Sequence, residues 1–364
     1  MKNTFKKWLP VLGVFTCSLA FAATNTDSSS YDSSMMNQQK ATKTNKMYKE
    51  ITPPAGPNVD NGVGFSIYAD YILWEARAGG LEAAQTGVSQ TAAGVSTLTK
   101  GQTFAPGFKY QSGFQVGASA ELGHDNWTVD TKYTWLHTSD KRTSFGSATA
   151  AASTMQAIYM TAPASHVLTT GNTEWNLRFN AVQLNLGRDF LVSENLSLRP
   201  YYGIRGAWHN QRQNTNYTFS NTTSGSTGTQ DWNVWTKQNW WGVGFQTGLD
   251  TGWWFDENWA IYANFGSSLL WGRWNVQNRE KKTDVDPDTY KENWASTAYG
   301  VQPTLDLEMG VRWMMSFDDN TYAFLVQAGW EQQVWINHQQ LNPIATAADD
   351  LSLQGFNFRA RFYF

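Results

Sequence analysis

Cysteine is nearly absent from this 364-residue sequence, which contains one, Cys17. Because Cys17 lies in the N-terminal apolar stretch, disulfide bonds and thiolate chemistry are excluded for the rest of the chain. Charged residues are also few, at 16% against roughly 25% in an average soluble protein. Beyond residue 22 no apolar run approaches the ~20 residues that a membrane-spanning helix needs. The sequence therefore excludes a disulfide scaffold and a helical membrane protein.

The N-terminus has the layout of a secretory signal. Three lysines within the first seven residues precede an apolar stretch and the small-x-small end Ala20-Phe21-Ala22, which predicts a cleavable signal peptide over residues 1–22. Removing those lysines from the 27 basic residues leaves 24 against 30 acidic residues, a net charge of −6, and argues against a nucleic-acid partner. Residues 23–62 are predicted to be a flexible periplasmic segment, with a short helix within residues 35–51 as the alternative.

Aromatic residues and glycine are abundant, with 19 Trp, 30 Gly and an aromatic fraction of 15%. In residues 239–254 large apolar or Thr side chains occupy every second position from Trp241 to Trp253, and the positions between are Gly, Gln and Asp. Similar alternation over 9 to 13 residues recurs after Val63 and predicts β-strands. These strands exceed the ~5–6 residues of an average soluble strand and match the ~9–11 residues of a tilted membrane-spanning strand.

Short turns and long polar loops alternate between these segments. Four turns end in an acidic residue followed by Asn126, Asn195, Asn258 or Asn320, and Asn suits tight turns because it tolerates positive φ. The alternation is that of an outer-membrane barrel, whose short turns are periplasmic and whose long loops are extracellular. We predict an all-β, closed antiparallel transmembrane β-barrel over residues 63–364 with about 10 strands, or 12 if the first two loops hide a further hairpin.

The turns and loops delimit the predicted strands, which cover residues 63–75, 110–122, 126–138, 174–190, 195–210, 239–254, 258–274, 299–317, 321–337 and 351–364. In the fourth strand the apolar phase changes between Phe179 and Val182. This change predicts a bulge or break at that point.

Tryptophan is placed at both ends of the predicted strands, where aromatic rings anchor a barrel at the two membrane interfaces. The expected girdle consists of Trp127, Trp253, Trp254, Trp259 and Trp313 near the short turns, and of Trp74, Trp135, Trp208, Trp271, Trp274 and Trp335 near the loops. The last strand finishes in Phe364, which resembles the signal strand read by the bacterial barrel-assembly machinery.

The opposite strand faces define the expected lumen. Its charged residues are Asp70, Asp130, Lys132, Arg199, Arg205, Asp250, Asp306, Glu308, Arg312, Glu331, Arg359 and Arg361, with Arg178 also placed inside. Filled barrels have about 8 strands and open channels about 16–18, so this barrel lies between them, and glycines at 242, 244, 248 and 252 leave room inside. Two interpretations stay open: the charges line a narrow aqueous pore, or they pair across strands and plug it.

Particular contacts are expected within this lumen. Asp306, Glu308 and Glu331 lie on neighbouring strands and are candidates for an acidic constriction. Arg359 and Arg361 are candidates to pair with Asp70 where the first and last strands meet. Such pairing would close the barrel seam electrostatically.

The order of several segments resembles one family. These segments, spread over residues 63–364, are GFSIYADYILWEARAGGLEAA, FQVGASAELGHDNWTVDTKYTWLHT, AVQLNLGRDF, LSLRPYYGIRGAWHNQ, GVGFQTGLDTGWWF and LDLEMGVRWMM. They are similar to the Legionella-type pore-forming outer-membrane proteins and to the major-outer-membrane-protein-like porins of environmental chlamydiae. The resemblance implies diffusion of small solutes across the outer membrane. The chlamydial major proteins are rich in cysteine and this chain is not, so envelope cross-linking by disulfides is not expected.

The predicted function is that of a porin-like protein of the bacterial outer membrane, through which ions and small hydrophilic solutes diffuse by a narrow, mixed-charge lumen. The expected partners are outer-membrane lipid, the barrel-assembly machinery and these solutes, and no cofactor or metal is expected. The alternative is a structural or adhesive barrel with a plugged lumen and loops that contact a ligand.

The sequence contains only parts of a catalytic motif and of a metal-binding motif. His137, His209 and His338 are expected near the loop end, and His137 forms a His-x-Ser pair with Ser139, but no acid to orient the histidine is evident. Residues 284–292 have three aspartates at calcium-loop spacing but lack the Gly at position six and the Glu at position twelve. They are expected to form a solvated acidic loop.

Overall fold

The structure is a computed structural model that describes residues 55–57, 59, 62–87, 101–122, 126–139, 143–146, 155–160, 162–163, 166–221, 228–283, 290–341 and 349–364. The predicted signal peptide, residues 23–54 and the acidic aspartates of 284–288 lie outside the described residues. Among the described residues no helix is long and apolar enough to cross a membrane. The described residues all belong to one compact unit, Lys49–Phe364.

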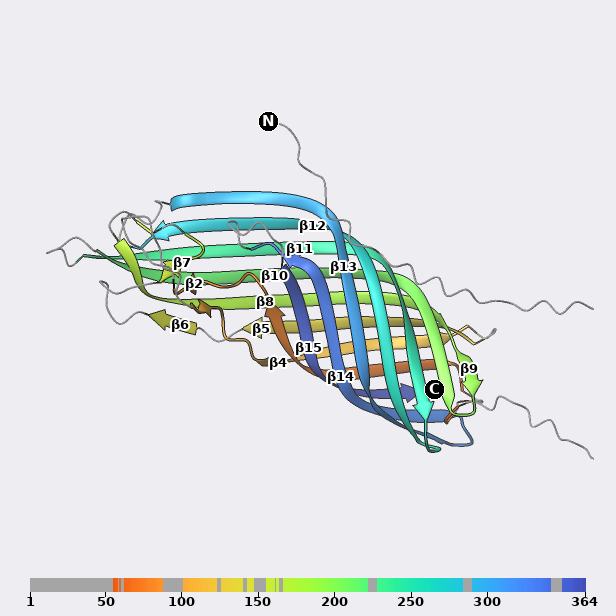
Figure 1. Cartoon of the computed structure of the whole chain (residues 1–364). Coiled ribbons are helices and arrows are strands. Elements are labelled where there is room, and N and C mark those ends of the chain that lie inside the picture. Colours follow the sequence, from red (N-terminus) through yellow and green to blue (C-terminus); the bar gives the residue numbers. More distant parts are fainter. Residues whose placement is uncertain are drawn as a thin grey trace, which may run out of the picture. The chain divides into compact units, whose positions relative to one another are not determined.

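In the described part of the chain, ten antiparallel strands close into a ring (Figure 1). They are β1 (Phe65–Ala78), β4 (Tyr110–Glu121), β5 (Trp127–Ser139), β8 (His166–Arg188), β10 (Leu196–Asn221), β11 (Thr229–Trp254), β12 (Trp259–Lys282), β13 (Tyr290–Phe317), β14 (Tyr322–Gln339) and β15 (Asp349–Tyr363). Each pairs with the next in this order, and β15 returns to β1. The predicted closed ten-stranded barrel is confirmed.

Five shorter strands lie outside this ring. β2 (Ala84–Gln85), β3 (Thr103–Phe104) and β7 (Gln156–Ala157) form a separate three-stranded sheet, β6 (Thr143–Gly146) pairs with β8, and β9 (Phe190–Ser193) pairs with β10. The first two loops therefore contain strands, as the twelve-strand alternative required, but none of these strands joins the described ring.

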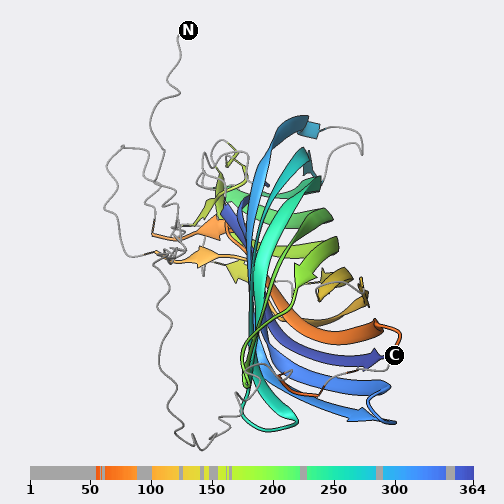
Figure 2. The ribbon, with the colours of Figure 1, turned by 90° about the vertical axis from the view of Figure 1, so that its right-hand side faces the viewer.

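The alternation of side chains sorts each strand into an inner and an outer face as the sheet curves round (Figure 2). On β11, Trp241, Phe245 and Trp253 are 52%, 79% and 53% exposed, whereas Trp240 and Gln246 are buried. Large apolar side chains are exposed in the same way on the neighbouring strands β10, β12 and β13. An exposed apolar band of this extent is stable only against hydrocarbon, so the apolar face meets lipid.

Phe245 provides a test of this assignment. Its exposed position among apolar neighbours predicts that Phe245→Arg costs about 2–4 kcal/mol of folding free energy, the usual cost of arginine at the bilayer midplane. Thr229→Arg, at an exposed position at the loop end of β11 opposite Ser220, is expected to change stability by less than about 0.5 kcal/mol. Urea titrations in phospholipid vesicles measure both. Equal stability of the two variants would contradict the lipid-facing assignment.

The strands β8 and β10 to β13 have 23 to 28 residues, whereas β4 and β5 have 12 and 13. A span requires only about 9–11 residues, so the long strands continue past the membrane at the loop end. The sequence predicted long loops between the strands 195–210 and 239–254 and between the strands 258–274 and 299–317, and this was wrong for most of both segments. Outside the bilayer the outer face is polar, so the pattern of apolar-out alternation disappears while the backbone pairing continues.

The predicted bulge in the fourth strand is also wrong. β8 keeps an unbroken register with β5 from Asn176 to Arg188 and with β10 from Thr170 to Gly187. Leu177 and Phe179 point inward, and Val182 and Leu184 point outward. The apolar positions change parity because the interior itself changes from apolar to polar along the barrel.

The acidic-Asn turns divide into two kinds. Asn126 and Asn320 adopt positive φ values of 56° and 61°, as expected for Asn in a tight turn. Asn195 and Asn258 do not adopt positive φ. Instead the Asn195 side-chain amide donates to the Trp254 carbonyl at 2.6 Å and links two adjacent short turns.

Candidate functional site: a charged chamber below an aromatic plug

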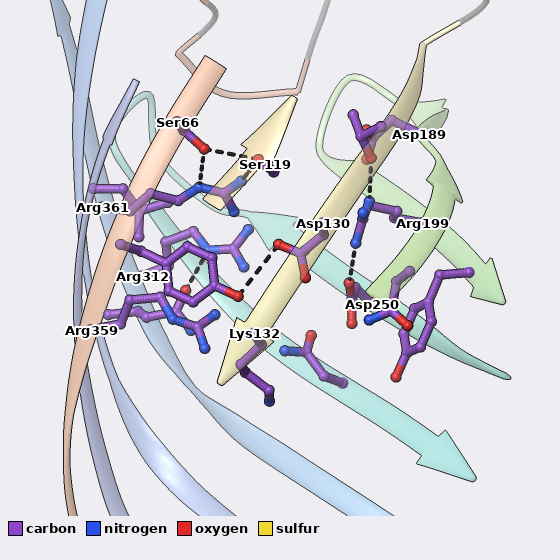
Figure 3. Close-up of a pocket in the computed structure, with 18 of the residues that line it drawn as sticks. Ser66, Ser119, Asp130, Lys132, Asp189, Arg199, Asp250, Arg312, Arg359 and Arg361 are labelled. Atoms are coloured by element: carbon purple, nitrogen blue, oxygen red, sulfur yellow. Dashed lines mark hydrogen bonds and ion pairs between the residues drawn. The ribbon is translucent and has the colours of Figure 1, made fainter. Parts of the chain in front are cut away.

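A cavity of about 240 Å³ occupies the barrel interior towards the short-turn end, and this volume has room for several water molecules. We call it the charged chamber, after the charged residues that line it: Glu121, Asp130, Lys132, Asp189, Arg199, Asp250, Asp306, Glu308, Arg312, Glu331, Arg359 and Arg361. Figure 3 shows Arg312, Arg359 and Arg361 gathered on one side, facing Asp130 and Lys132 on β5. Most of these side chains occupy inward positions of their strands, so the alternation of the strands places them there.

Ten of the twelve residues expected in the lumen line the charged chamber. The other two, Asp70 and Arg205, are buried beside it and bind Arg359 and Asp306. Arg178 differs, because it occupies an outward position of β8 and is exposed. Whether the ten residues conduct solutes stays a prediction.

Sequence reasoning missed several polar groups of the chamber. Gln183 and Asn185 face inward like Phe179. They were missed because the incorrectly predicted bulge obscured the direction in which they face. Glu121 lines the chamber from the last position of β4, and Asp189 lines it from the position between β8 and β9. At such strand ends alternation no longer assigns a face. These two positions had no signal in the sequence.

The seam between the first and last strands is closed by an ion pair. Asp70 lies directly opposite Arg359 in the β1–β15 ladder, and the Arg359 Nε and Nη2 atoms donate to the two carboxylate oxygens of Asp70, both at 2.7 Å. The guanidinium also lies 4.6 Å from the centre of the Tyr68 ring. Arg361, the other expected partner of Asp70, instead donates to Ser66 at 2.8 Å and to Ser119.

Two further arginines are held by aspartates. Arg199 donates to Asp250 at 2.9 Å. Arg205, whose side chain is fully buried, donates to Asp306 at 2.5 Å and to Gln333 at 3.0 Å. Bidentate or multiply bonded guanidinium groups of this kind are fixed in place. These charges are therefore structural parts of the wall.

In the described part of the chain, other charges face the chamber without an oppositely charged partner in direct contact. Glu308 and Glu331 are opposite each other in the β13–β14 ladder and accept hydrogen bonds only from neutral groups, among them Tyr262 at 3.0 Å and Asn357 at 3.0 Å. Within the described residues Lys132 has neither an ion pair nor a hydrogen bond, although it lies in the field of both glutamates.

An aromatic cluster fills the interior above this chamber, towards the loops. We call it the aromatic plug, and it contains Trp74, Trp175, Phe179, His209, Trp240, Trp274, Trp335 and His338. The His209 ring stacks on Phe179 with centroids 4.5 Å apart and lies 4.5 Å from Trp335, and its Nδ1 atom is 3.1 Å from Nε2 of His338. All eight side chains are almost inaccessible to solvent, so the plug closes the described interior at this level.

Arg205 joins the chamber to the plug, since its guanidinium lies 4.9 Å from the centre of the Trp335 ring. The plug is incompletely hydrogen-bonded: the indole nitrogens of Trp74, Trp240 and Trp335 and Nε2 of His209 are buried without a partner. A buried donor without an acceptor costs about 1–3 kcal/mol relative to its hydrated state. Hydration of these donors would therefore offset part of the cost of opening the plug.

The aromatic girdle requires a correction. Trp208, Trp253, Trp259 and Trp271 are exposed on the outer face, and Trp127, Trp135 and Trp313 are half-buried. Trp74, Trp254, Trp274 and Trp335, also expected in the girdle, are buried inside the barrel. Strand alternation explains the difference, since Trp74 shares its face with Asp70, and Trp335 shares its face with Glu331. Trp254 packs at the short-turn end against Ala55 and Val59.

The glycines of β11 also serve a different purpose from the one expected. A Cβ atom at Gly242 would collide with the Trp240 ring, and a Cβ atom at Gly248 would collide with the Tyr201 ring. These positions therefore leave room for aromatic side chains of the barrel itself. The expected widening of the lumen by Gly242 and Gly248 was wrong.

The loop end is built from a second apolar cluster beyond the membrane. Ala84, Met155, Tyr159 and Phe219 are buried there, and burial raises the pKa of Tyr159 well above its usual range. His209 and His338, expected near this rim, lie instead inside the plug, and His137 is exposed on the outer face. Among the described residues no group of three or more His, Cys, Asp or Glu could hold a metal ion.

In the comparison with known proteins, one family model matches this chain. The model of the family described as "Legionella pneumophila major outer membrane protein precursor" matches residues 57–364. No curated protein matches the chain. Among solved structures, the outer membrane protease OmpT from Escherichia coli is 10% identical over 82% of this chain and 96% of its own, with a TM-score of 0.40. The CymD monoaromatic hydrocarbon channel is 9% identical over 83% and 89%, with a TM-score of 0.31, and a FadL homologue from Pseudomonas aeruginosa is 8% identical over 85% and 95%, with a TM-score of 0.26.

Proposed function

The chain belongs to the family of the Legionella pneumophila major outer membrane protein and is an outer-membrane barrel, and we propose that it is a porin-like channel with a gate. In this proposal the charged chamber is the solute path, and the aromatic plug is the gate that closes it. Ions and small hydrophilic solutes pass when the plug rearranges.

The observation that carries the proposal is the division of charges in the chamber. Arginines bonded to aspartates fix the wall, while Lys132, Glu308 and Glu331 face the cavity without an ion-pair contact to any of the described residues. A purely structural core has little reason to hold charges unpaired, because burying them is costly. In a conducting path the same charges bias ion traffic.

The direct test is single-channel conductance of the refolded chain in a planar bilayer. We expect brief openings separated by long closed periods, because the plug fills the interior in the described conformation. A membrane that stays silent at all voltages and for variants of the plug would overturn the proposal. It would favour the second candidate function, that of a structural or adhesive barrel. The aromatic plug that fills the interior is the observation that supports this alternative.

The unpaired charges predict the ion preference of the open state. Glu308→Gln with Glu331→Gln is expected to shift the cation-to-anion permeability ratio towards anions by at least about fivefold, because each unit charge about 4 Å from an ion contributes about 1 kcal/mol even at the dielectric constant of water. Lys132→Gln is expected to shift the ratio towards cations. Reversal potentials in a salt gradient measure both shifts.

A matched control separates pore charges from wall charges. Arg199→Gln with Asp250→Asn removes one ion pair of the wall and leaves the net charge unchanged. This variant should keep the permeability ratio of the unmodified protein. A shift as large as that of the glutamate variant would refute the division between the two kinds of charge.

A further inference from the structure

The outer face of β8 and β10 to β12 changes chemistry in layers towards the loop end. The apolar layer includes Val182, Ile204 and Val243, the aromatic layer includes Trp208, Trp241 and Trp271, and the amide layer consists of Asn180, Asn210, Asn239 and Asn275. Above these lies a group of cations that we call the basic patch: Arg178, Arg212, Lys237 and Arg279. A fifth cation, Arg273, lies just below the patch, between Trp271 and Asn275 on β12. The four strands lie side by side (Figure 1).

Positively charged side chains of the basic patch are neighbours on adjacent strands. Arg212 lies directly opposite Lys237 in the β10–β11 ladder, and Arg178 lies opposite Asn210, one outward position from Arg212. Like charges directly opposite each other on a sheet destabilise it. Within the described residues none of these three cations makes an ion pair or a hydrogen bond, so the fold does not use them internally.

Little negative charge compensates the patch. On the described outer face of these strands beyond the aromatic layer, the acidic residues are Glu174, opposite Asn214, and Asp231, which accepts a hydrogen bond from Thr218 at 2.6 Å. Arg273 provides an independent sign of a missing acceptor. Its guanidinium lies over the Tyr299 ring at 5.7 Å, and its Nε atom is buried without a hydrogen-bond partner.

The distance of the basic patch from the aromatic layer indicates which region of the membrane the patch contacts. Arg212 and Lys237 are four residues beyond Trp208 and Trp241, which at about 3.3 Å per residue and a tilt of about 35–45° places them about 10 Å above the aromatic layer. Aromatic girdles mark the membrane interface. Arg212 and Lys237 therefore stand at the level of lipid head groups, above outward side chains that contact acyl chains.

We propose that the basic patch binds the phosphorylated head group of a glycolipid of the outer leaflet. Guanidinium forks match phosphate oxygens, so Arg178 and Arg212 with Lys237 take the phosphates, and the amide layer takes sugar hydroxyls. The acyl chains lie along the apolar layer below. The bound phosphates neutralise the repulsion between Arg212 and Lys237, which gives these unpaired cations a function.

The experiment uses the full chain folded in detergent and titrated with lipid A carrying two phosphates or none. We expect the phosphorylated form to bind at least tenfold more tightly by native mass spectrometry. The variant Arg178→Gln, Arg212→Gln, Lys237→Gln should lose that preference. Without lipid it should melt no lower than the unmodified protein, because it removes like-charge repulsion and no ion pair.

A charge-matched control is Arg188→Gln, Lys281→Gln, Lys282→Gln, which removes three positive charges from other positions of the strands. This control should keep the tenfold preference. Equal binding of the two lipids by the unmodified protein would overturn the proposal, as would a preference that survives in the patch variant. Loss of the preference in both variants would assign it to general surface charge and would also overturn the proposal.

Discussion

Removing two indole rings from the aromatic plug, by Trp240→Ala and Trp335→Ala, is expected to convert a channel that is mostly closed into one that is mostly open. The two rings pack against each other with centroids 5.6 Å apart, and both contact His209. Truncating a buried Trp to Ala costs about 3–5 kcal/mol. If the closed state loses about 3 kcal/mol of packing that the open state lacks, the closed-to-open ratio falls by about a hundredfold. Single-channel recording in a planar bilayer measures the open probability.

The control for this prediction is the next residue in the chain. Trp241 occupies the outward position beside Trp240 and is 52% exposed, so Trp241→Ala removes the same indole from the lipid face. Its open probability should equal that of the unmodified protein. The gate is refuted if the double variant folds, as judged by circular dichroism, and conducts no more than the Trp241→Ala control.

The second large effect is expected at the barrel seam. Arg359→Met leaves the fully buried Asp70 carboxylate without its partner, and breaking one side of a buried ion pair costs about 3–5 kcal/mol. Asp70→Asn together with Arg359→Met should cost less than the single arginine variant, since no uncompensated charge then remains. Urea unfolding in phospholipid vesicles, followed by tryptophan fluorescence, measures the free energies.

Another ion pair of β1 provides the comparison. Arg77 contacts Glu75 at 3.0 Å, but the Arg77 side chain is 57% exposed. Arg77→Met is therefore expected to cost less than about 1 kcal/mol, as exposed pairs do. Equal costs at Arg77 and Arg359 would mean that the seam is not desolvated, and the account of barrel closure would fail.

Most of the strand framework could be predicted because the bilayer imposes it on the sequence. Apolar side chains must face hydrocarbon at every second position, so the period-two pattern around Phe245 and Met309 is legible without any tertiary information. The same parity placed Asp70, Asp130 and Glu308 inside, and their inward position follows from the pleat alone. Turn residues such as Asn126 and Asn320 then marked the strand ends.

Errors arose where residue type was used in place of parity. Trp74 and Trp335 were assigned to the girdle because tryptophan favours membrane interfaces, although their strand positions match Asp70 and Glu331. In the fourth strand, apolar side chains were expected to face outward throughout. The inward-facing Leu177 and Phe179 therefore led to the incorrect prediction of a bulge. Both errors have the same cause, because aromatic and apolar side chains fill the barrel interior at the level of the aromatic plug.

What the sequence by itself determined is a closed ten-stranded barrel whose apolar face meets lipid, because alternation and strand length are local properties of the chain. The sequence offered both Arg359 and Arg361 as partners of Asp70, and only the tertiary structure decided between them and determined which other inward charges of the described residues pair. Asp70 and Arg359 are 289 residues apart, and Arg205 and Asp306 are 101 residues apart, so their contacts depend on the register of distant strands. The same holds for the plug, where side chains from many strands meet only after the ring has closed.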